Sequence, residues 1–225
     1  MFINSKQQEG NMEALVLVAH ADDETLGCGG TIRKLVAKGW DVRVVILSNG
    51  VLDVRGRVED NRAHAAAACA LLGVGEPVLL GFADQKFDQA PLAEMAGAVF
   101  RLGLAPDLIL THASTDLNMD HRLACDVAKI VGRPKSKPVS ILGCETPGTS
   151  ALNGAPFPAN YYVDISSELA AKVAAFSLYT NELQDFPHPC SAKGLRLLAE
   201  YHGMQCGFPL AEAFTVIRGY EGRLP

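Results

Sequence analysis

The sequence predicts an α/β domain with a mainly parallel β-sheet flanked by helices, and three observations support this prediction. Apolar runs of strand length alternate with segments of helix length through the first two-thirds of the 225 residues. Glycine follows several helical segments, as at Gly39 and Gly73. A chain of this length with 48% hydrophobic residues can also bury the two layers of core that such a sheet needs.

Each element follows from its own pattern. The runs around Val16 and Val44 consist almost entirely of Val, Ile and Leu, which is typical of strands buried on both faces. Residues 60–72 are rich in alanine and residues 91–102 begin with proline, and both features are typical of helices. Strands that alternate with such helices form right-handed βαβ units. Strands are expected at 14–20, 41–48, 77–82, 106–112 and 139–144, and helices at 25–38, 60–72, 91–102 and 119–131.

The final third of the chain departs from this alternation. Residues 147–160 are rich in Pro, Gly, Asn and Ala and predict a long loop, and the polar segment 52–58 predicts a shorter one. Further strands are expected at 161–165 and 213–218, and further helices at 167–179 and 191–202. We therefore expect a polar lead at 1–12 and one domain at 13–225, with a C-terminal elaboration that folds back to wall the active site.

The composition argues against several classes of partner. A formal net charge of −5 without a Lys/Arg-rich run argues against nucleic acid. No apolar stretch reaches the roughly 18–20 residues that membrane insertion requires. Residues 1–12 carry no apolar signal region, and the six scattered cysteines show no paired zinc spacing, so we expect a cytoplasmic protein with reduced thiols. The oligomeric state stays open, a homo-oligomer included.

One imidazole and three carboxylates stand at the end of the first expected strand, namely His20, Asp22, Asp23 and Glu24. Adjacent acids repel one another and need a partner. A divalent cation would offset their charge and accept His and Asp as ligands. The glycines at 27–30 are better interpreted as helix-packing residues than as a dinucleotide loop, because the final glycine of GxGxxG is missing.

A second polar cluster follows the fourth expected strand. It begins at His112 and continues through Asp116, Asn118 and Asp120 to His121. Ligands in open parallel sheets bind at the carboxyl ends of the strands, so both clusters are expected to meet at one edge. Three protein ligands and an open position for water are what a catalytic zinc ion requires. We regard Asp116 and Asp120 as loop-shaping or supporting carboxylates, with Asp120 a candidate for orienting a ligand histidine.

These motifs resemble a known family. Residues 19–24 (Ala-His-Ala-Asp-Asp-Glu) are similar to the Ala-His-Pro-Asp-Asp-Glu signature of the LmbE-like, or PIG-L-like, zinc-dependent de-N-acetylases. Residues 116–122 resemble that family's second motif, which ends in Asp-His-Arg. Segments 157–161, 187–191 and 211–214 resemble a branch active on sugars or related metabolites, so the resemblance extends from about residue 13 to about residue 219.

The resemblance implies a single Rossmann-like domain with one zinc ion held by His20, Asp23 and His121. Asp22 would be the general base that takes a proton from zinc-activated water. The implied reaction removes an N-acetyl group from a small-molecule substrate, an N-acetylated sugar, sugar nucleotide or sugar conjugate, and releases acetate and a free amine. Glu24 would serve as a supporting carboxylate at the helix N-terminus.

The chain departs from the family pattern at two positions. Ala21 replaces the usual proline, and we expect a minor effect. Asn118 stands where many members carry a histidine, and an amide cannot act as an acid. We expect His188, between two prolines, to be the catalytic acid, with His112 as the second choice. Asn118 and Arg62 are expected to bind substrate, and the alternative for Arg62 is a solvated helix start.

Two other functions stay open. One is deacylation of a non-sugar N-acyl metabolite in natural-product biosynthesis, and the other is a non-catalytic sugar- or nucleotide-binding Rossmann-like module with a vestigial metal site. Asp22 favours an enzyme, because a binding module needs no base beside its ligands. A His/Asp/His site can also hold iron, cobalt or manganese. Residues 157–162 either line a sugar pocket or pack as a loop.

Overall fold

The computed structural model describes residues 11–54, 56–135 and 137–225. Its strands are β1 (Glu13–Val18), β2 (Asp41–Ser48), β3 (Val51–Val54), β4 (Arg57–Asp60), β5 (Val78–Phe82), β6 (Leu108–His112), β7 (Ser140–Cys144), β8 (Tyr161–Asp164) and β9 (Ala211–Arg218). Seven of them form one sheet in the order β5-β2-β1-β6-β7-β9-β8. The first five strands of this order are parallel, and β9 is antiparallel to both β7 and β8.

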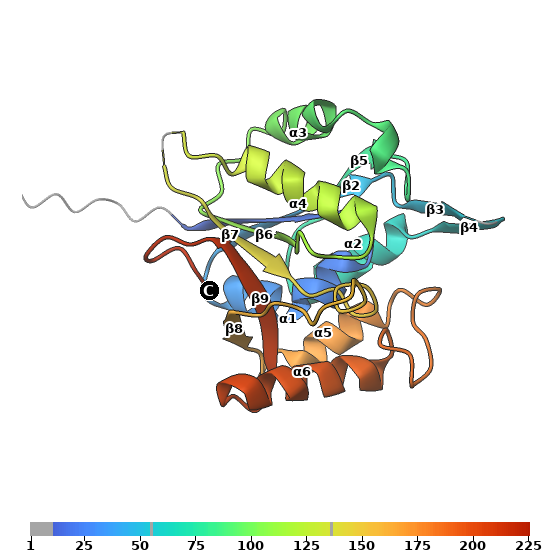
Figure 1. The fold of residues 1–225 in the computed structure, drawn as a ribbon, viewed down its shortest axis with the longest axis vertical. Helices are drawn as coiled ribbons and strands as arrows, with labels where there is room; N and C mark the ends of the chain where they lie inside the picture. Colours follow the sequence, from blue (N-terminus) through green and yellow to red (C-terminus); the bar gives the residue numbers. More distant parts are fainter. Residues whose placement is uncertain (1–10, 55, 136) are drawn as a thin grey trace, which may run out of the picture.

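Helices cover both faces of this sheet (Figure 1). They are α1 (Asp23–Ala37), α2 (Arg62–Leu72), α3 (Leu92–Phe100), α4 (Met119–Val131), α5 (Leu169–Phe176) and α6 (Ala192–Cys206), with a short 3-10 turn at Phe87–Gln89. Helices α3 and α4 lie on one face, and α1, α2, α5 and α6 lie on the other. The expectation of an α/β fold with a mainly parallel sheet between helices is therefore confirmed.

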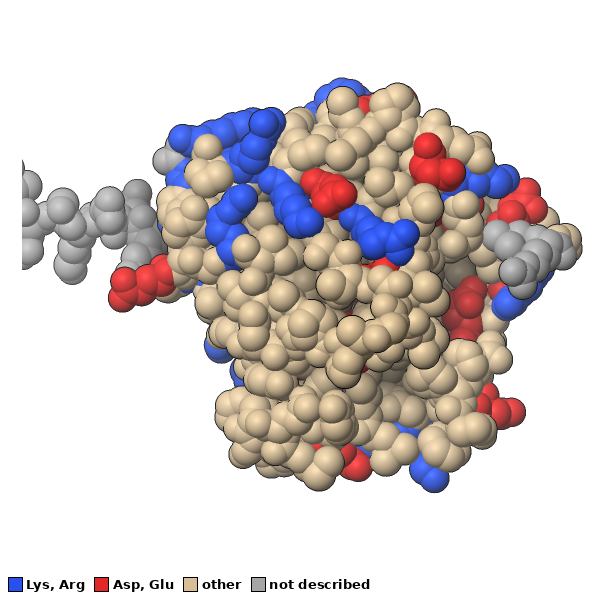
Figure 2. Space-filling view, in the orientation of Figure 1, with Lys and Arg blue, Asp and Glu red and all other residues tan. Residues whose placement is uncertain are grey.

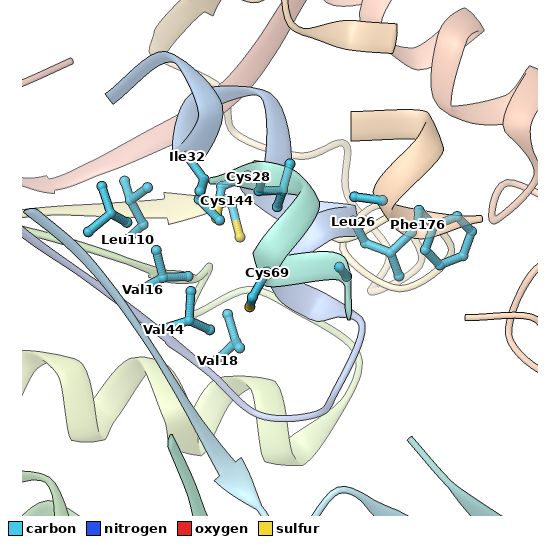
Figure 3. Close-up of a cluster of buried hydrophobic side chains, with 14 of the residues drawn as sticks. Val16, Val18, Leu26, Cys28, Ile32, Val44, Cys69, Leu110, Cys144 and Phe176 are labelled. Atoms are coloured by element: carbon cyan, nitrogen blue, oxygen red, sulfur yellow. The ribbon is translucent and has the colours of Figure 1, made fainter. Parts of the chain in front are cut away.

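The apolar strands are buried on both faces, as their composition predicts. Val16 and Val18 of β1 join one hydrophobic cluster with Ile32 of α1 and Cys69 of α2 (Figure 3). The alternate residues of β1, which include Leu15, point to the opposite face and pack with residues of α3 and α4. Because the strands are packed on both faces, their ends are held in place. The polar side chains that follow the strand ends are therefore held in place as well.

The glycines of α1 allow close packing, which confirms the interpretation made from the sequence. A Cβ atom on Gly30 would lie 2.7 Å from Cγ2 of Ile165, closer than real Cβ atoms approach. The helix is also interrupted at Cys28, whose φ of −147° is not helical. The first turn of α1, which carries the acidic motif, is therefore set at its own angle to the rest of the helix.

One element differs from the prediction. Residues 52–58 are not a loop, because β3 and β4 pair as an antiparallel hairpin with Val51 opposite Asp60 and Leu52 opposite Glu59. Leu52 and Val54 flank Asp53, Val58 lies between Arg57 and Glu59, and the turn includes Gly56 with a positive φ of 79°. The hairpin projects from the domain (Figure 1), and only some of its residues are partly buried. A strand in such a position can carry many polar side chains, and these hid the strand pattern in the sequence.

The final third adds two helices and the strands β9 and β8, which pair antiparallel to each other, and β9 is antiparallel to the neighbouring β7. A long connection between β7 and β8 contains the segment 147–160, as expected. Four of the six cysteines are buried, and the other two are partly buried. Among the residues that the structure describes, no helix combines the length and the apolar character needed to cross a membrane.

Candidate metal centre

The acidic motif and the second polar cluster meet at the carboxyl edge of the sheet, as the sequence predicts. His20 follows β1, Asp23 begins α1, and His121 lies in the first turn of α4. Their candidate ligand atoms all lie within 4.8 Å of one another, and all three residues are buried. Strands β1 and β6 are adjacent and parallel, which brings together side chains 101 positions apart in sequence.

The facing atoms identify which nitrogen each histidine offers. Nε2 of His121 lies 3.3 Å from Nδ1 of His20 and 3.5 Å from Oδ1 of Asp23. Nδ1 of His20 lies 3.4 Å from Oδ2 of Asp23. Two imidazole nitrogens and a carboxylate thus converge on one point, and this donor set fits a zinc ion in character and number. His20 Nδ1, a carboxylate oxygen of Asp23 and His121 Nε2 are thus the atoms that could hold a metal ion.

The outer nitrogen of His121 faces a supporting carboxylate. Its Nδ1 lies 3.2 Å from Oδ1 of Asp116, which is itself fully buried. The carboxylate of Asp116 also accepts hydrogen bonds from the hydroxyl of Ser150 at 2.6 Å and the backbone N–H of Asn118 at 2.8 Å. Because Asp116 is held in place, it can fix the tautomer that leaves Nε2 free for a metal.

His20 has a similar arrangement on its outer side. Its Nε2 lies 3.2 Å from Oδ2 of Asp120 and 3.6 Å from Oδ1 of Asp84. Asp120 is held by the backbone N–H of Phe87, and its own backbone N–H donates to the capping side chain of Asn118. Although burial opposes it, the hydrogen bond to Asp120 raises the pKa of His20 well above its usual value in the metal-free protein. The expectation that Asp120 faces a ligand histidine agrees with this contact.

His112 lies behind the ligands and is completely buried. Its ring stacks on that of His121 with centroids 3.9 Å apart. Its Nε2 accepts from the backbone N–H of Ala19 at 3.1 Å, and its Nδ1 contacts the hydroxyl of Thr146 at 3.1 Å. Burial and the neighbouring His121 lower the pKa of His112. The lowered pKa favours a neutral imidazole, which packs against His121.

The two remaining acids of the motif have different surroundings. Asp22 lines the cavity above the ligands and has a positive φ of 143°, a backbone conformation that is rare for a residue other than glycine. Burial and the nearby carboxylates of Asp23, Glu182 and Glu24 raise the pKa of Asp22. Glu24 is buried and accepts hydrogen bonds from the Tyr179 hydroxyl at 2.5 Å and the Asp22 backbone N–H at 3.1 Å. Burial raises the pKa of Glu24 to about 7.

A cavity of about 190 Å³ opens over these residues, and we call it the catalytic cavity. Among its described lining residues are four carboxylates and no lysine or arginine. A cation is therefore the natural partner of this surface, and an anionic group is not. The lining comprises His20, Ala21, Asp22, Asp23, Leu26, Gly50, Leu52, Asn61, Asp84, Gln85, Asn118, His121, Thr146, Pro147, Thr149, Glu182 and Cys190.

The other sequence-predicted residues are placed differently. Asn118 lines the catalytic cavity, whereas Arg62 is exposed at the start of α2 and forms an ion pair with Asp60 at 2.5 Å. His188 is exposed in the loop before α6, and its Nδ1 accepts from the backbone N–H of Cys190. Arg62, His188 and the segment 157–162 are not among the described residues that line the catalytic cavity.

Sequence reasoning missed several lining residues, among them Asp84, Gln85 and Glu182. Asp84 and Gln85 follow β5, at the same sheet edge as the motifs, and Glu182 lies in the loop after α5. Gln85 has a positive φ of 55°, and its amide lies 3.2 Å from Nε2 of His20. The position of Asp84 two residues after a strand was a signal that could have been used. Nothing in the local sequence marks Glu182.

Comparison with known proteins agrees with this geometry. The family model described as PIG-L, GlcNAc-PI de-N-acetylase, matches residues 15–131, which is just over half of the chain and includes all three candidate ligands. The chain belongs to the PIG-L family. It is also 25% identical over 230 residues to a diacetylchitobiose deacetylase of Thermococcus kodakarensis, covering 92% of this chain and 84% of that protein.

Solved structures show the fold that the PIG-L chain adopts. An N,N'-diacetylchitobiose deacetylase from Pyrococcus horikoshii matches with a TM-score of 0.74 at 21% identity, covering 91% of this chain and 83% of that one. A 4-carboxy-2-hydroxymuconate hydratase from Pseudomonas putida KT2440 matches with a TM-score of 0.71 at 22% identity, covering 93% and 97%. Since proteins named as a deacetylase and a hydratase share this fold, the reaction must be argued from the site.

Proposed function

We propose that this PIG-L protein is a zinc-dependent N-deacetylase acting on an N-acetylated sugar, sugar nucleotide or sugar conjugate. The observation that carries the proposal is the convergence of His20, Asp23 and His121 directly beside the cavity-lining carboxylate of Asp22. The family match and the deacetylase relative support the same reaction. Acetate and a free amine would be the products.

The donor set would hold one zinc ion, and the ion when bound would supply positive charge to polarise an amide carbonyl and acidify water. The supporting carboxylates Asp116 and Asp120 keep the two ligand histidines in their tautomers and orientations. Glu24 holds the backbone N–H of Asp22 and so fixes the first turn of α1. These contacts leave one carboxylate of the motif, that of Asp22, facing the cavity without a ligand role.

Asp22 would accept the proton that the attacking water loses, as a general base. Asn118 has an amide that lines the same cavity and could donate an N–H to a substrate oxygen. His188 stays our proposal for the group that protonates the departing amine. It lies in the loop next to Cys190, which does line the cavity, so that loop would have to move to bring the imidazole into the cavity.

Several finer features belong to the same proposal. Glu182 and Cys190 in the cavity lining support the idea that the C-terminal elaboration walls the active site of a Rossmann-like domain spanning 13–225. Arg62 would reach a substrate only after leaving its partner Asp60. A small-molecule substrate and a cytoplasmic location also stay predictions.

The test is acetate release from a panel of N-acetylated sugars and sugar conjugates, with and without a chelator, on protein of known metal content. We expect chelator-sensitive release that zinc restores. Asp22→Ala should retain the metal and lose about 10²–10⁴-fold in kcat, because a general base contributes about that factor. His20→Ala should lose both metal and turnover.

The matched control is Asp53→Ala, which removes an exposed carboxylate from the hairpin and should change neither property. A near-normal rate for Asp22→Ala would refute the assigned base. A metal-loaded protein that releases no acetate from any sugar would favour a non-sugar N-acyl substrate. A chain that binds no metal would favour the binding module.

A further inference from the structure

A second and larger cavity lies beside the catalytic cavity, with a volume of about 830 Å³. It is formed by the loop after β7, the loop before α6, and α6 itself. We call it the apolar groove and define it by the side chains of Ala151, Leu152, Phe186, Pro187, Leu197 and Tyr201. The six side chains that define the groove have no role in the metal chemistry described above, so the groove requires an explanation of its own.

Large hydrophobic side chains are exposed in this groove to an unusual degree. Leu152 is 64% exposed, Tyr201 50%, Phe186 49% and Leu197 43%. Single exposed hydrophobic residues are normal, but a contiguous group of them marks a binding surface. Figure 2 shows few Lys, Arg, Asp or Glu side chains over this loop region and α6. The groove is therefore a mainly apolar surface, and the ammonium of Lys193 lies over its Phe186 ring, 4.2 Å from the ring centre.

The groove is continuous with the catalytic cavity. Pro147, Thr149 and Cys190 line both cavities, and the Cys190 thiol lies 3.5 Å from the carbonyl oxygen of Pro147. These residues form a shared wall over which one molecule could extend. The catalytic cavity of about 190 Å³ is smaller than the roughly 300–1,000 Å³ of ordinary ligand sites. A substrate of ordinary size must extend beyond the catalytic cavity, and the groove is the adjoining space.

The charges around the groove restrict what it can hold. Its described lining contains one carboxylate, Glu145, and that group is paired with His202 of α6. The imidazole of His188 also lines the groove, and no lysine or arginine does. A phosphate or a nucleotide would find no lysine or arginine among these lining residues, and the nearby ammonium of Lys193 is held over the Phe186 ring. An uncharged apolar group that binds in the groove would bury its surface against proline, leucine and aromatic side chains, and this removal of apolar surface from water is favourable.

We propose that the apolar groove binds an uncharged alkyl or aryl group attached to the N-acetylated substrate, so that the substrate is a sugar conjugate rather than a sugar nucleotide. The proposal rests on the proposed deacetylase function and narrows its substrate class. The N-acetyl group would occupy the catalytic cavity, and the apolar group would lie along Leu197 and Phe186.

The test is a series of alkyl β-glycosides of N-acetylglucosamine from methyl to hexyl. We expect kcat/KM to increase by about fourfold for each methylene that becomes fully buried, which predicts at least a tenfold increase from methyl to hexyl. Leu197→Asp should abolish the increase and leave the methyl glycoside rate within about twofold. Met204→Asp is the matched control, because Met204 is an exposed apolar residue of the same helix that does not line the groove.

A flat series with normal acetate release would overturn the groove proposal and leave the deacetylase function standing. If no glycoside releases acetate, calorimetric binding of hexyl β-glucoside, which lacks the acetamide, tests the groove by itself. Binding that Leu197→Asp removes and Met204→Asp retains would support the groove while the deacetylase proposal fails. Absence of that binding would refute the groove. A flat series with Leu197-dependent binding to phosphatidylcholine vesicles would make it a membrane contact and overturn the proposal.

Discussion

The buried ion pair between Lys172 and Glu212 gives the sharpest stability prediction. The ammonium of Lys172 lies 2.6 Å from Oε1 of Glu212, and both side chains are buried. Glu212 also accepts from the backbone N–H groups of Gly30 and Thr31, at 2.9 and 2.7 Å, which the interruption of α1 leaves without helical partners. Lys172 donates to the carbonyl oxygen of Leu26 at 2.8 Å. The pair therefore stabilises the α1 break that positions the acidic motif.

Removing one member of the pair should lower the free energy of unfolding by much more than the intact pair adds to it. Lys172→Met leaves a buried carboxylate without its cation, and Glu212→Gln leaves a buried ammonium with neutral acceptors. We expect each single change to lower the free energy of unfolding by about 3–5 kcal/mol. The double variant leaves no unpaired charge and loses mainly hydrogen bonds, so its cost should be about 1–3 kcal/mol. The coupling energy should therefore be at least about 3 kcal/mol.

The assay is urea unfolding of the four proteins at pH 7 with equal metal content. Asp41→Asn is the control, because the Arg43–Asp41 pair is exposed and should contribute no more than about 1 kcal/mol. If the two single effects add to give the double effect within about 0.5 kcal/mol, the two groups act independently and the argument is wrong. A single variant as stable as the wild type would refute it equally.

Two further predictions concern the metal centre. Asp116→Asn should weaken zinc binding by about 10–100-fold, measured by chelator competition, because the carboxylate orients His121; unchanged affinity would remove that role. Glu24→Gln tests the buried carboxyl group, whose pKa of about 7 lies above its ordinary 4.5. The folded metal-free protein holds this proton more tightly than the unfolded chain, so its stability should fall by about 3 kcal/mol as pH rises from about 4.5 to about 7. Urea unfolding across this range should show a smaller fall in the variant, and an identical profile would contradict the shift.

The sequence was sufficient for the sheet and for bringing the candidate ligands together, because both depend on local patterns and on the family motifs. The buried strands read as continuous apolar runs, and helix α4 was predicted with its observed bounds of Met119–Val131. His20, Asp23 and His121 lie at strand ends or in first helical turns, where the parallel topology alone brings them together. The hairpin was missed because its polar residues hide its alternation, and its existence depends on pairing between two short strands.

The outer parts of the site depend on contacts that no local pattern encodes. The loop that carries His188 connects α5 and α6, so its position depends on how these helices pack. It places the His188 imidazole in the lining of the apolar groove. Asp84 comes to His20 from β5, two strands away from β1 in the sheet. A motif can therefore name candidate metal ligands, because the chemistry of metal binding restricts their identity and spacing. It cannot name the residues that choose the substrate, because those come from loops whose positions are set by the whole fold.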